Sequence, residues 1–197
     1  MSLSPTLDDE VLSCGGTIAQ HVADGDDVTV MFFTDGVSGR YVYTAEDVKK
    51  RRAMADAAQK VLGYHAMKSL GFKDQRLDTY PQLELNRSIE KEVAEFKPDI
   101  VLTHWDQDNN LDHRLVSQEC QVACRSVGKI FMGKPVGNWS QKSFAMAFAK
   151  NKYSGVGEVD VSDCLDVKQR ALDCYKEELG EVVAEPVELF IKTEWSP

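Results

Sequence analysis

The sequence predicts an α/β fold, Rossmann-like, in which an open and mostly parallel sheet carries helices on both faces. Runs of β-branched and aromatic residues at 28–33 and 100–103 are typical of strands that are covered on both sides. Helical segments alternate with these runs, which indicates right-handed βαβ crossovers. The 197 residues and the 43% hydrophobic composition suffice for one core, so we expect a single domain over 1–197.

The elements are assigned in order from the spacing of apolar residues and from the residues that stop them. Apolar residues at helical spacing predict helices over 15–24, 45–62, 85–96 and 166–179. Continuous apolar runs predict strands over 28–33 and 100–103, and a further short strand is expected over 67–71. Gly63 stops the second helix, and Pro98 ends the third. We expect residues 128–137, rich in glycine and lysine, to form a surface loop, and the final third to supply edge strands.

Three loops are expected to meet at one edge of this sheet. Ligands of open α/β folds bind beyond the carboxyl ends of the strands, and three segments follow such ends, at 6–10, 34–40 and 104–113. The candidate site therefore lies where these loops converge.

The first loop carries two adjacent carboxylates, Asp8 and Asp9, between a short strand and a helix. It reads Ser4-Pro-Thr-Leu-Asp-Asp-Glu10 and leads into Gly15-Gly16-Thr17. The helix dipole favours acidic residues at this position, before the first turns of a helix.

The last loop reads His104-Trp-Asp-Gln-Asp-Asn-Asn-Leu-Asp-His113 and holds three aspartates and two of the four histidines in the chain. Taken alone, such a run is typical of a solvated loop. Its convergence with Asp8 and Asp9 favours a site, because a carboxylate oxygen and an imidazole nitrogen are typical ligands of a catalytic zinc. A second carboxylate beside them could take a proton from water.

With these two loops, the chain resembles the PIG-L/LmbE-like family of metal-dependent de-N-acetylases. The first family motif is matched by Ser4, Pro5, Leu7, Asp8, Asp9, Glu10 and Gly15-Gly16-Thr17. The second motif, in one branch of the family, is matched by Thr103, His104, Asp108, Asn110, Asp112, His113 and Arg114. Relative to the family, the first strand and the segment 180–184 look shortened.

The resemblance implies a role for each matched residue. Asp9 and His113 fall on metal-ligand positions, Asp8 falls on the general base, and Asp112 supports the ligands. Asn110 takes the place of a histidine that stabilises the oxyanion, and an amide can still donate a hydrogen bond there. Three further residues resemble substrate-binding positions, although each could also be an ordinary surface residue: Arg52, Asp74 and Asp108.

Thr6 departs from the family, because it falls on the first histidine ligand and threonine is a poor ligand for zinc. Three alternatives stay open. Asp9 and His113 could hold zinc with a substitute ligand, either Asp108 or His104. The chain could instead be a sugar-binding pseudoenzyme, or Thr6 could have been introduced into an ordinary hydrolase.

The leading expectation is a zinc-dependent hydrolase that removes acetyl from an N-acetylated amino sugar, free or in a glycoconjugate. The net charge of −9 argues against a nucleic-acid partner, and no apolar stretch is long enough to span a membrane. The five cysteines do not read as a disulfide framework, so we expect reduced thiols and a cytoplasmic protein. No G-x-G-x-x-G follows a predicted strand, which disfavours a nucleotide binder. Assembly of identical chains stays open.

Overall fold

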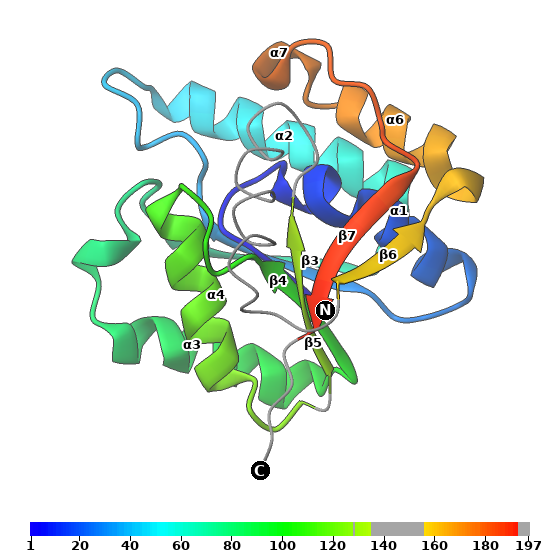
Figure 1. The fold of residues 1–197 in the computed structure, drawn as a ribbon. Helices are drawn as coiled ribbons and strands as arrows, with labels where there is room; N and C mark the ends of the chain where they lie inside the picture. The colour runs from blue at the N-terminus through cyan, green and yellow to red at the C-terminus, as the bar shows by residue number, and fades with distance from the viewer. Residues whose placement is uncertain (128, 135–155, 193–197) are drawn as a thin grey trace.

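Strands of the computed structural model, which describes residues 1–127, 129–134 and 156–192, form one sheet in the order β3-β2-β1-β4-β5-β7-β6 (Figure 1). Their bounds are β1 Ser2–Ser4, β2 Thr29–Thr34, β3 Ala66–Phe72, β4 Ile100–His104, β5 Lys129–Lys134, β6 Val156–Asp160 and β7 Val187–Lys192. The strands β1 to β5 pair in parallel, whereas β7 runs antiparallel to β5 and β6. The prediction of a mostly parallel sheet is confirmed.

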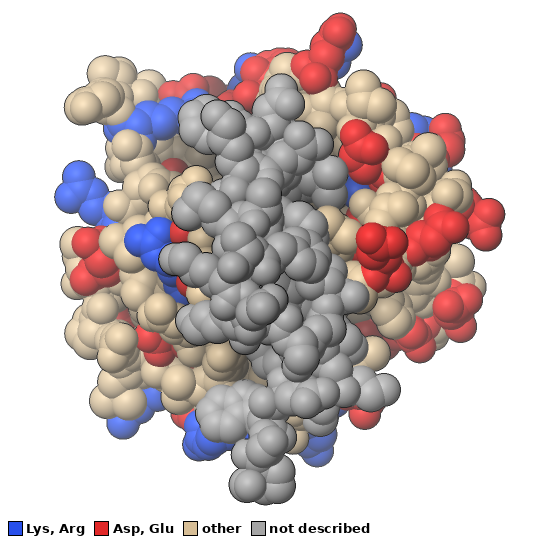
Figure 2. Space-filling model, viewed as in Figure 1, with Lys and Arg blue, Asp and Glu red and all other residues tan. Residues whose placement is uncertain are grey.

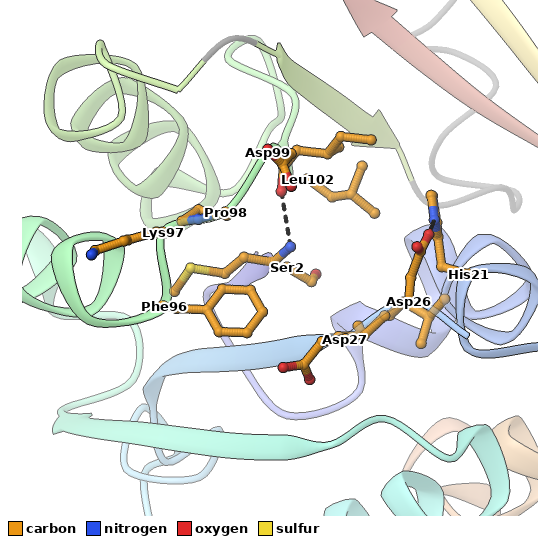
Figure 3. A pocket seen from close by; sticks show the side chains of 13 residues that line it. Ser2, His21, Asp26, Asp27, Phe96, Lys97, Pro98, Asp99 and Leu102 are labelled. Carbon is orange, nitrogen blue, oxygen red and sulfur yellow. Dashed lines mark hydrogen bonds and ion pairs between the residues drawn. The ribbon is translucent and has the colours of Figure 1, made fainter. Parts of the chain in front are cut away.

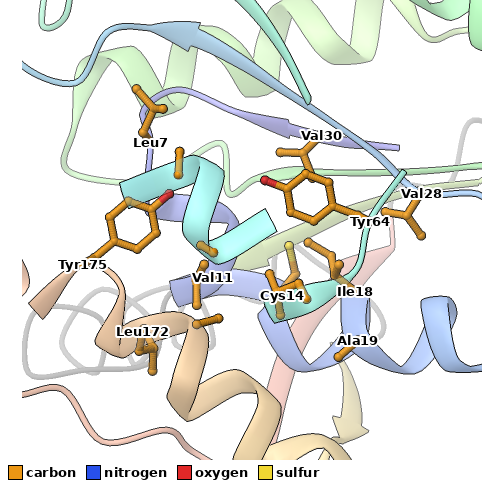
Figure 4. Close-up of a cluster of buried hydrophobic side chains, with 14 of the residues drawn as sticks. Leu7, Val11, Cys14, Ile18, Ala19, Val28, Val30, Tyr64, Leu172 and Tyr175 are labelled. Carbon is orange, nitrogen blue, oxygen red and sulfur yellow. The ribbon is translucent and has the colours of Figure 1, made fainter. Parts of the chain in front are cut away.

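Helices cover both faces of the sheet, as predicted. The main helices are α1 Asp9–Ala23, α2 Ala45–Leu62, α3 Gln82–Phe96, α4 Leu111–Ala123 and α6 Leu165–Asp173. One apolar cluster joins α1, α2 and α6 to the sheet (Figure 4), and a second joins α3 and α4 to the opposite face. Alternate residues of β2 point to opposite clusters, Val30 and Phe32 to the first and Met31 and Phe33 to the second.

The first helix begins at Asp9, earlier than the predicted start at residue 15, because two helical segments join across a kink at Cys14 (φ −148°, ψ 22°). The kink frees backbone N–H groups inside the helix, and Glu188 of β7 accepts hydrogen bonds from the N–H groups of Gly16 and Thr17, both at 2.8 Å. The Nζ atom of Lys168 lies 2.7 Å from the same carboxylate. The side chain of Glu188 thus caps the second segment of α1.

The prediction of a surface loop over residues 128–137 is wrong for the part that the structure describes. Residues Lys129–Lys134 form β5, which pairs in parallel with β4. Ile130 and Met132 are buried at alternate positions, but the surrounding glycine and lysine hid this short alternation in the sequence. The remaining positions of the predicted loop, 128 and 135–137, lie outside the described residues.

The helix predicted over 166–179 is divided into α6 and the short helix α7 Lys176–Leu179. Cys174 and Tyr175 separate them, and Tyr175 is fully buried. Two 3-10 turns complete the described elements, η1 Leu77–Thr79 and η2 Ser162–Cys164. Among the described helices, none combines the length and the apolar character needed to cross a membrane.

Candidate metal centre and active site

Three side chains form a cluster at the carboxyl ends of the neighbouring strands β1 and β4. Asp9 opens α1, His104 ends β4, and His113 lies in the first turn of α4. One ligand atom from each lies within 4.8 Å of the others, and all three residues are buried. Oδ2 of Asp9 is the shared neighbour, at 3.7 Å from Nε2 of His104 and 3.6 Å from Nε2 of His113. One carboxylate and two imidazoles make a donor set that fits a catalytic zinc with an open position.

Asp108 contacts His113 at the ring nitrogen that does not face Asp9. Its Oδ2 atom lies 3.3 Å from Nδ1 of His113, so Nε2 of that ring faces Asp9. The other oxygen of Asp108 accepts the N–H of Asn110 at 2.8 Å, and Arg114 donates to the carbonyl of Asp108 at 2.6 Å. A carboxylate on the far nitrogen of a ligating histidine is a common arrangement in metal sites. Asp108 thus lies behind His113 rather than beside Asp9 as a third ligand.

The two histidines differ in their protonation. Burial, followed by the neighbouring His113, lowers the pKa of His104 to about 4, so its imidazole is neutral at physiological pH. Burial acts in the same direction on His113, but the carboxylates of Asp9 and Asp108 outweigh it and raise the pKa of His113 to about 9. Metal binding at this cluster therefore has to displace a proton from His113.

Asp8 is held from two sides. Its φ of 122° and ψ of −27° lie in a region that residues other than glycine rarely adopt. NH2 of Arg51 donates to its Oδ2 at 2.6 Å, and its backbone N–H donates to Oε2 of Glu10 at 2.9 Å. Burial, followed by the charge of Asp9, raises the pKa of Asp8 well above its usual range, and Arg51 opposes this rise.

Thr6 contacts Asp9 through its backbone. Its N–H donates to Oδ2 of Asp9 at 3.0 Å, and its Oγ1 atom is buried without a hydrogen-bond partner among the described residues. A Cβ atom at Gly36, where φ is +66°, would clash with that Oγ1, so the two loops touch here. Because His104 provides a third donor, the cluster has three protein ligand atoms without Thr6. Of the two substitutes that the sequence left open, the geometry favours His104 over Asp108.

Asn110 and Asp112 shape the start of α4. Oδ1 of Asn110 accepts the N–H of Asp112 at 2.9 Å, which caps the helix and leaves the amide nitrogen as the donor of that side chain. Oδ1 of Asp112 accepts the N–H of Leu77 at 3.2 Å, so this carboxylate ties α4 to η1. Burial raises the pKa of Asp112.

Of the remaining residues expected to bind substrate, only Asp74 lies at this edge of the sheet. Its Oδ1 atom accepts the hydroxyl of Thr34, at the end of β2, at 3.3 Å. Arg52 instead pairs with Asp56 at 3.1 Å on α2, and its side chain is 41% exposed. The neighbouring Arg51 reaches Asp8, and sequence reasoning missed it. A signal was present, because Arg51 falls on the same helical stripe as the buried residues Met54, Ala55, Ala58 and Leu62.

A pocket lies at the opposite edge of the sheet (Figure 3). Its volume is about 300 Å³, and it opens between Met1, Ile100 and the segment Asp26–Val28 at the amino ends of the strands. None of Asp8, Asp9, His104 or His113 lines it. The cluster formed by the motif residues instead lies at the carboxyl edge.

An open, mostly parallel sheet with one carboxylate and two imidazoles at its carboxyl edge defines an α/β protein with a candidate metal site. The chain belongs to the PIG-L family: the family model described as GlcNAc-PI de-N-acetylase matches residues 1–124. This range includes Asp8, Asp9, His104 and His113. The resemblance stated from the motifs is confirmed.

Several proteins similar to this chain are described as deacetylases, and a structure with the same fold is described as a hydratase. The uncharacterized deacetylase YaiS of Escherichia coli K12 is 29% identical over 140 residues, which cover 67% of this chain and 71% of YaiS. N,N'-diacetylchitobiose deacetylase from Pyrococcus horikoshii shares the fold with a TM-score of 0.73, at 19% identity, over 91% of this chain and 70% of its own. GalB of Pseudomonas putida, a 4-carboxy-2-hydroxymuconate hydratase, also shares the fold, with a TM-score of 0.74 at 17% identity. The match covers 100% of this chain and 96% of GalB. The fold alone therefore does not fix the reaction.

Proposed function

We propose that this protein is a zinc-dependent amide hydrolase that removes the acetyl group from an N-acetylated amino sugar, free or within a glycoconjugate. The observation that carries the proposal is the buried cluster of Asp9, His104 and His113, together with the buried carboxylate of Asp8, which precedes Asp9 in the chain. Membership of the PIG-L family supports it, as does the deacetylase relative from Escherichia coli.

The three clustered residues would hold the zinc ion. Asp9 offers Oδ2 and both histidines offer Nε2, while Asp108 keeps the ring of His113 in the required orientation. When bound, the ion supplies a Lewis acid that polarises the amide carbonyl and lowers the pKa of water.

Asp8 would act as the general base. It takes a proton from the attacking water and returns the proton to the leaving amine, and a raised carboxylate pKa suits both transfers. The amide nitrogen of Asn110 would donate to the developing oxyanion, and Asp74 would accept a hydrogen bond from a sugar hydroxyl. Asp112 would act indirectly, by fixing the start of α4.

The alternative function is sugar binding without tightly held metal, and Thr6 is the observation that favours it. Thr6 contacts Asp9 only through its backbone N–H, so it offers no imidazole where the resemblance places the first histidine ligand. The presence of His104 in the cluster favours the hydrolase.

Metal content and amine release together test the proposal. Purified protein incubated with zinc and desalted should retain about one zinc per chain and release amine from N-acetylglucosamine or a glycoconjugate of it. His104→Ala should lose both properties. His65→Ala is the matched control, because His65 is exposed outside the cluster. Zinc retention without amine release from any N-acetyl sugar would contradict the hydrolase, and release of amine without zinc would contradict its metal dependence.

The cellular setting belongs to the same proposal. All five cysteines are free, and Cys14, Cys120, Cys124 and Cys164 are buried in the folded chain. Reduced thiols fit the cytoplasm. On the face drawn in Figure 2, Lys and Arg side chains are scattered among the described residues, which fits a sugar substrate better than a nucleic acid.

A further inference from the structure

We propose that Tyr175 is a positioning residue that fixes Asp8 through the two residues that hold it, Glu10 and Arg51. The inference rests on the proposed function, since it takes Asp8 to be the general base. Tyr175 lies outside residues 1–124, the part of the chain that the family model matches. The proposal thus adds a residue from the last third of the chain to a site whose motifs lie in the first two thirds.

The first contact of Tyr175 acts on the backbone of Asp8. The unusual φ of 122° at Asp8 needs support from the surrounding structure. Oε2 of Glu10 accepts the N–H of Asp8 at 2.9 Å, and Oε1 of Glu10 accepts the hydroxyl of Tyr175 at 2.9 Å. The hydroxyl therefore fixes the orientation of the carboxylate that holds the Asp8 backbone.

The second contact acts on the side chain of Asp8. The guanidinium carbon of Arg51 lies 5.4 Å from the ring centroid of Tyr175, within the range of a cation–π interaction. NH2 of the same guanidinium donates to Oδ2 of Asp8 at 2.6 Å. The ring therefore supports the cation that positions the proposed catalytic carboxylate.

The surroundings give Tyr175 little freedom to move. Tyr175 and Glu10 both have no exposed surface, and Tyr175 lies at the break between α6 and α7. A buried tyrosine hydroxyl requires a partner, and the carboxylate of Glu10 provides it. Helix α6 packs against both α1 and α2, the helices that carry Glu10 and Arg51.

Tyr175→Phe tests the hydroxyl alone, because the ring and its contact with Arg51 are retained. We expect kcat for amine release to fall about tenfold, with KM changed less than about twofold, since only the placement of the base is disturbed. Zinc content should stay at the wild-type level. Tyr64→Phe is the matched control: Tyr64 is also buried in the same apolar cluster, but its hydroxyl donates to Sδ of Met67. Unchanged kcat in Tyr175→Phe, or an equal loss in Tyr64→Phe, would overturn the proposal.

A measurement without substrate separates this proposal from the proposed function. Amide hydrogen exchange of the segment 6–12 should become faster in Tyr175→Phe and stay at the wild-type rate in Tyr64→Phe. Faster exchange in a protein that releases no amine would support the positioning contact while contradicting the hydrolase. Exchange at the wild-type rate in this segment would overturn the positioning role itself.

A second variant covers the case in which Tyr175→Phe does not fold. Glu10→Gln keeps the side-chain volume but leaves one acceptor oxygen for the two donors, Asp8 N–H and Tyr175 O–H. It should also lower kcat with little change in KM. When both substitutions are combined in a folded protein, the loss should not exceed that of the more damaging single variant, because they interrupt the same contact. Losses that multiply would overturn the proposal.

Discussion

The guanidinium of Arg51 donates a 2.6 Å hydrogen bond to Asp8, with the two side chains only 6% and 8% exposed. Neither charge has ready access to water, so each depends on the other. This pair joins the long helix α2 to the loop that precedes α1.

Arg51→Met should destabilise the protein by about 3 kcal/mol, because it leaves the carboxylate of Asp8 buried without its cation. Urea unfolding at constant pH measures the change. Arg52→Met is the matched control on the same helix, and loss of its exposed pair with Asp56 should cost less than about 1 kcal/mol. Adding Asp8→Asn to Arg51→Met should recover part of the loss. Equal effects of the two arginine variants would show that the buried pair is not ionic.

Gly16→Ala should destabilise the protein by about 2 kcal/mol or more through overpacking. A Cβ atom at this position would lie 2.5 Å from Cβ of Val161, a distance that requires the backbone to shift. Gly157→Ala is the control, since its Cβ would meet Phe190 O at an ordinary 3.8 Å. Val161→Ala should partly rescue Gly16→Ala in thermal unfolding, because it removes the two Cγ atoms that would lie 2.6 and 2.8 Å from the new Cβ. A harmless Gly16→Ala would mean that α1 and Val161 are not in this close contact.

Stability of the metal-free protein should fall as the pH rises from about 6.5 to about 9. The pKa of His113 is raised from 6.5 to about 9 in the folded chain by the carboxylates of Asp9 and Asp108, which outweigh burial. A raised pKa gives a contribution that is complete below the unfolded value and is lost as the pH passes the folded value. Urea unfolding with a chelator present, over this pH range, measures it. His113→Gln should flatten the dependence, and an equally steep curve in that variant would refute the assignment.

Much of the architecture follows from sequence periodicity. The helix over 45–62 was predicted with the bounds that the structure shows, because the residue spacing and the stop at Gly63 agree, and in the structure Thr44 caps its start. The strand predicted over 28–33 lies one residue further along the chain, at Thr29–Thr34. The strand predicted over 100–103 is one residue longer in the structure, at Ile100–His104. The prediction failed at β5, where pairing with β4 makes a strand of six residues rich in lysine and glycine.

The site was predictable in part. The motifs indicated Asp8, Asp9 and His113 and left His104 and Asp108 open as substitutes for a histidine at position 6, but only their positions in the fold favour His104. Arg51 was overlooked, although it falls on the buried stripe of α2. The contacts of Glu188 with Gly16 and Thr17 join residues far apart in the chain, which periodicity cannot reveal.

The cap on the second segment of α1 has a consequence for synthesis of the protein. The motif residues emerge from the ribosome early, whereas Glu188 lies on β7, the last strand of the described sheet. A nascent chain that already contains Asp9, His104 and His113 still lacks the partner of two backbone N–H groups in the helix that Asp9 begins. The helix acquires its final support only when β7 has left the exit tunnel and joined the sheet.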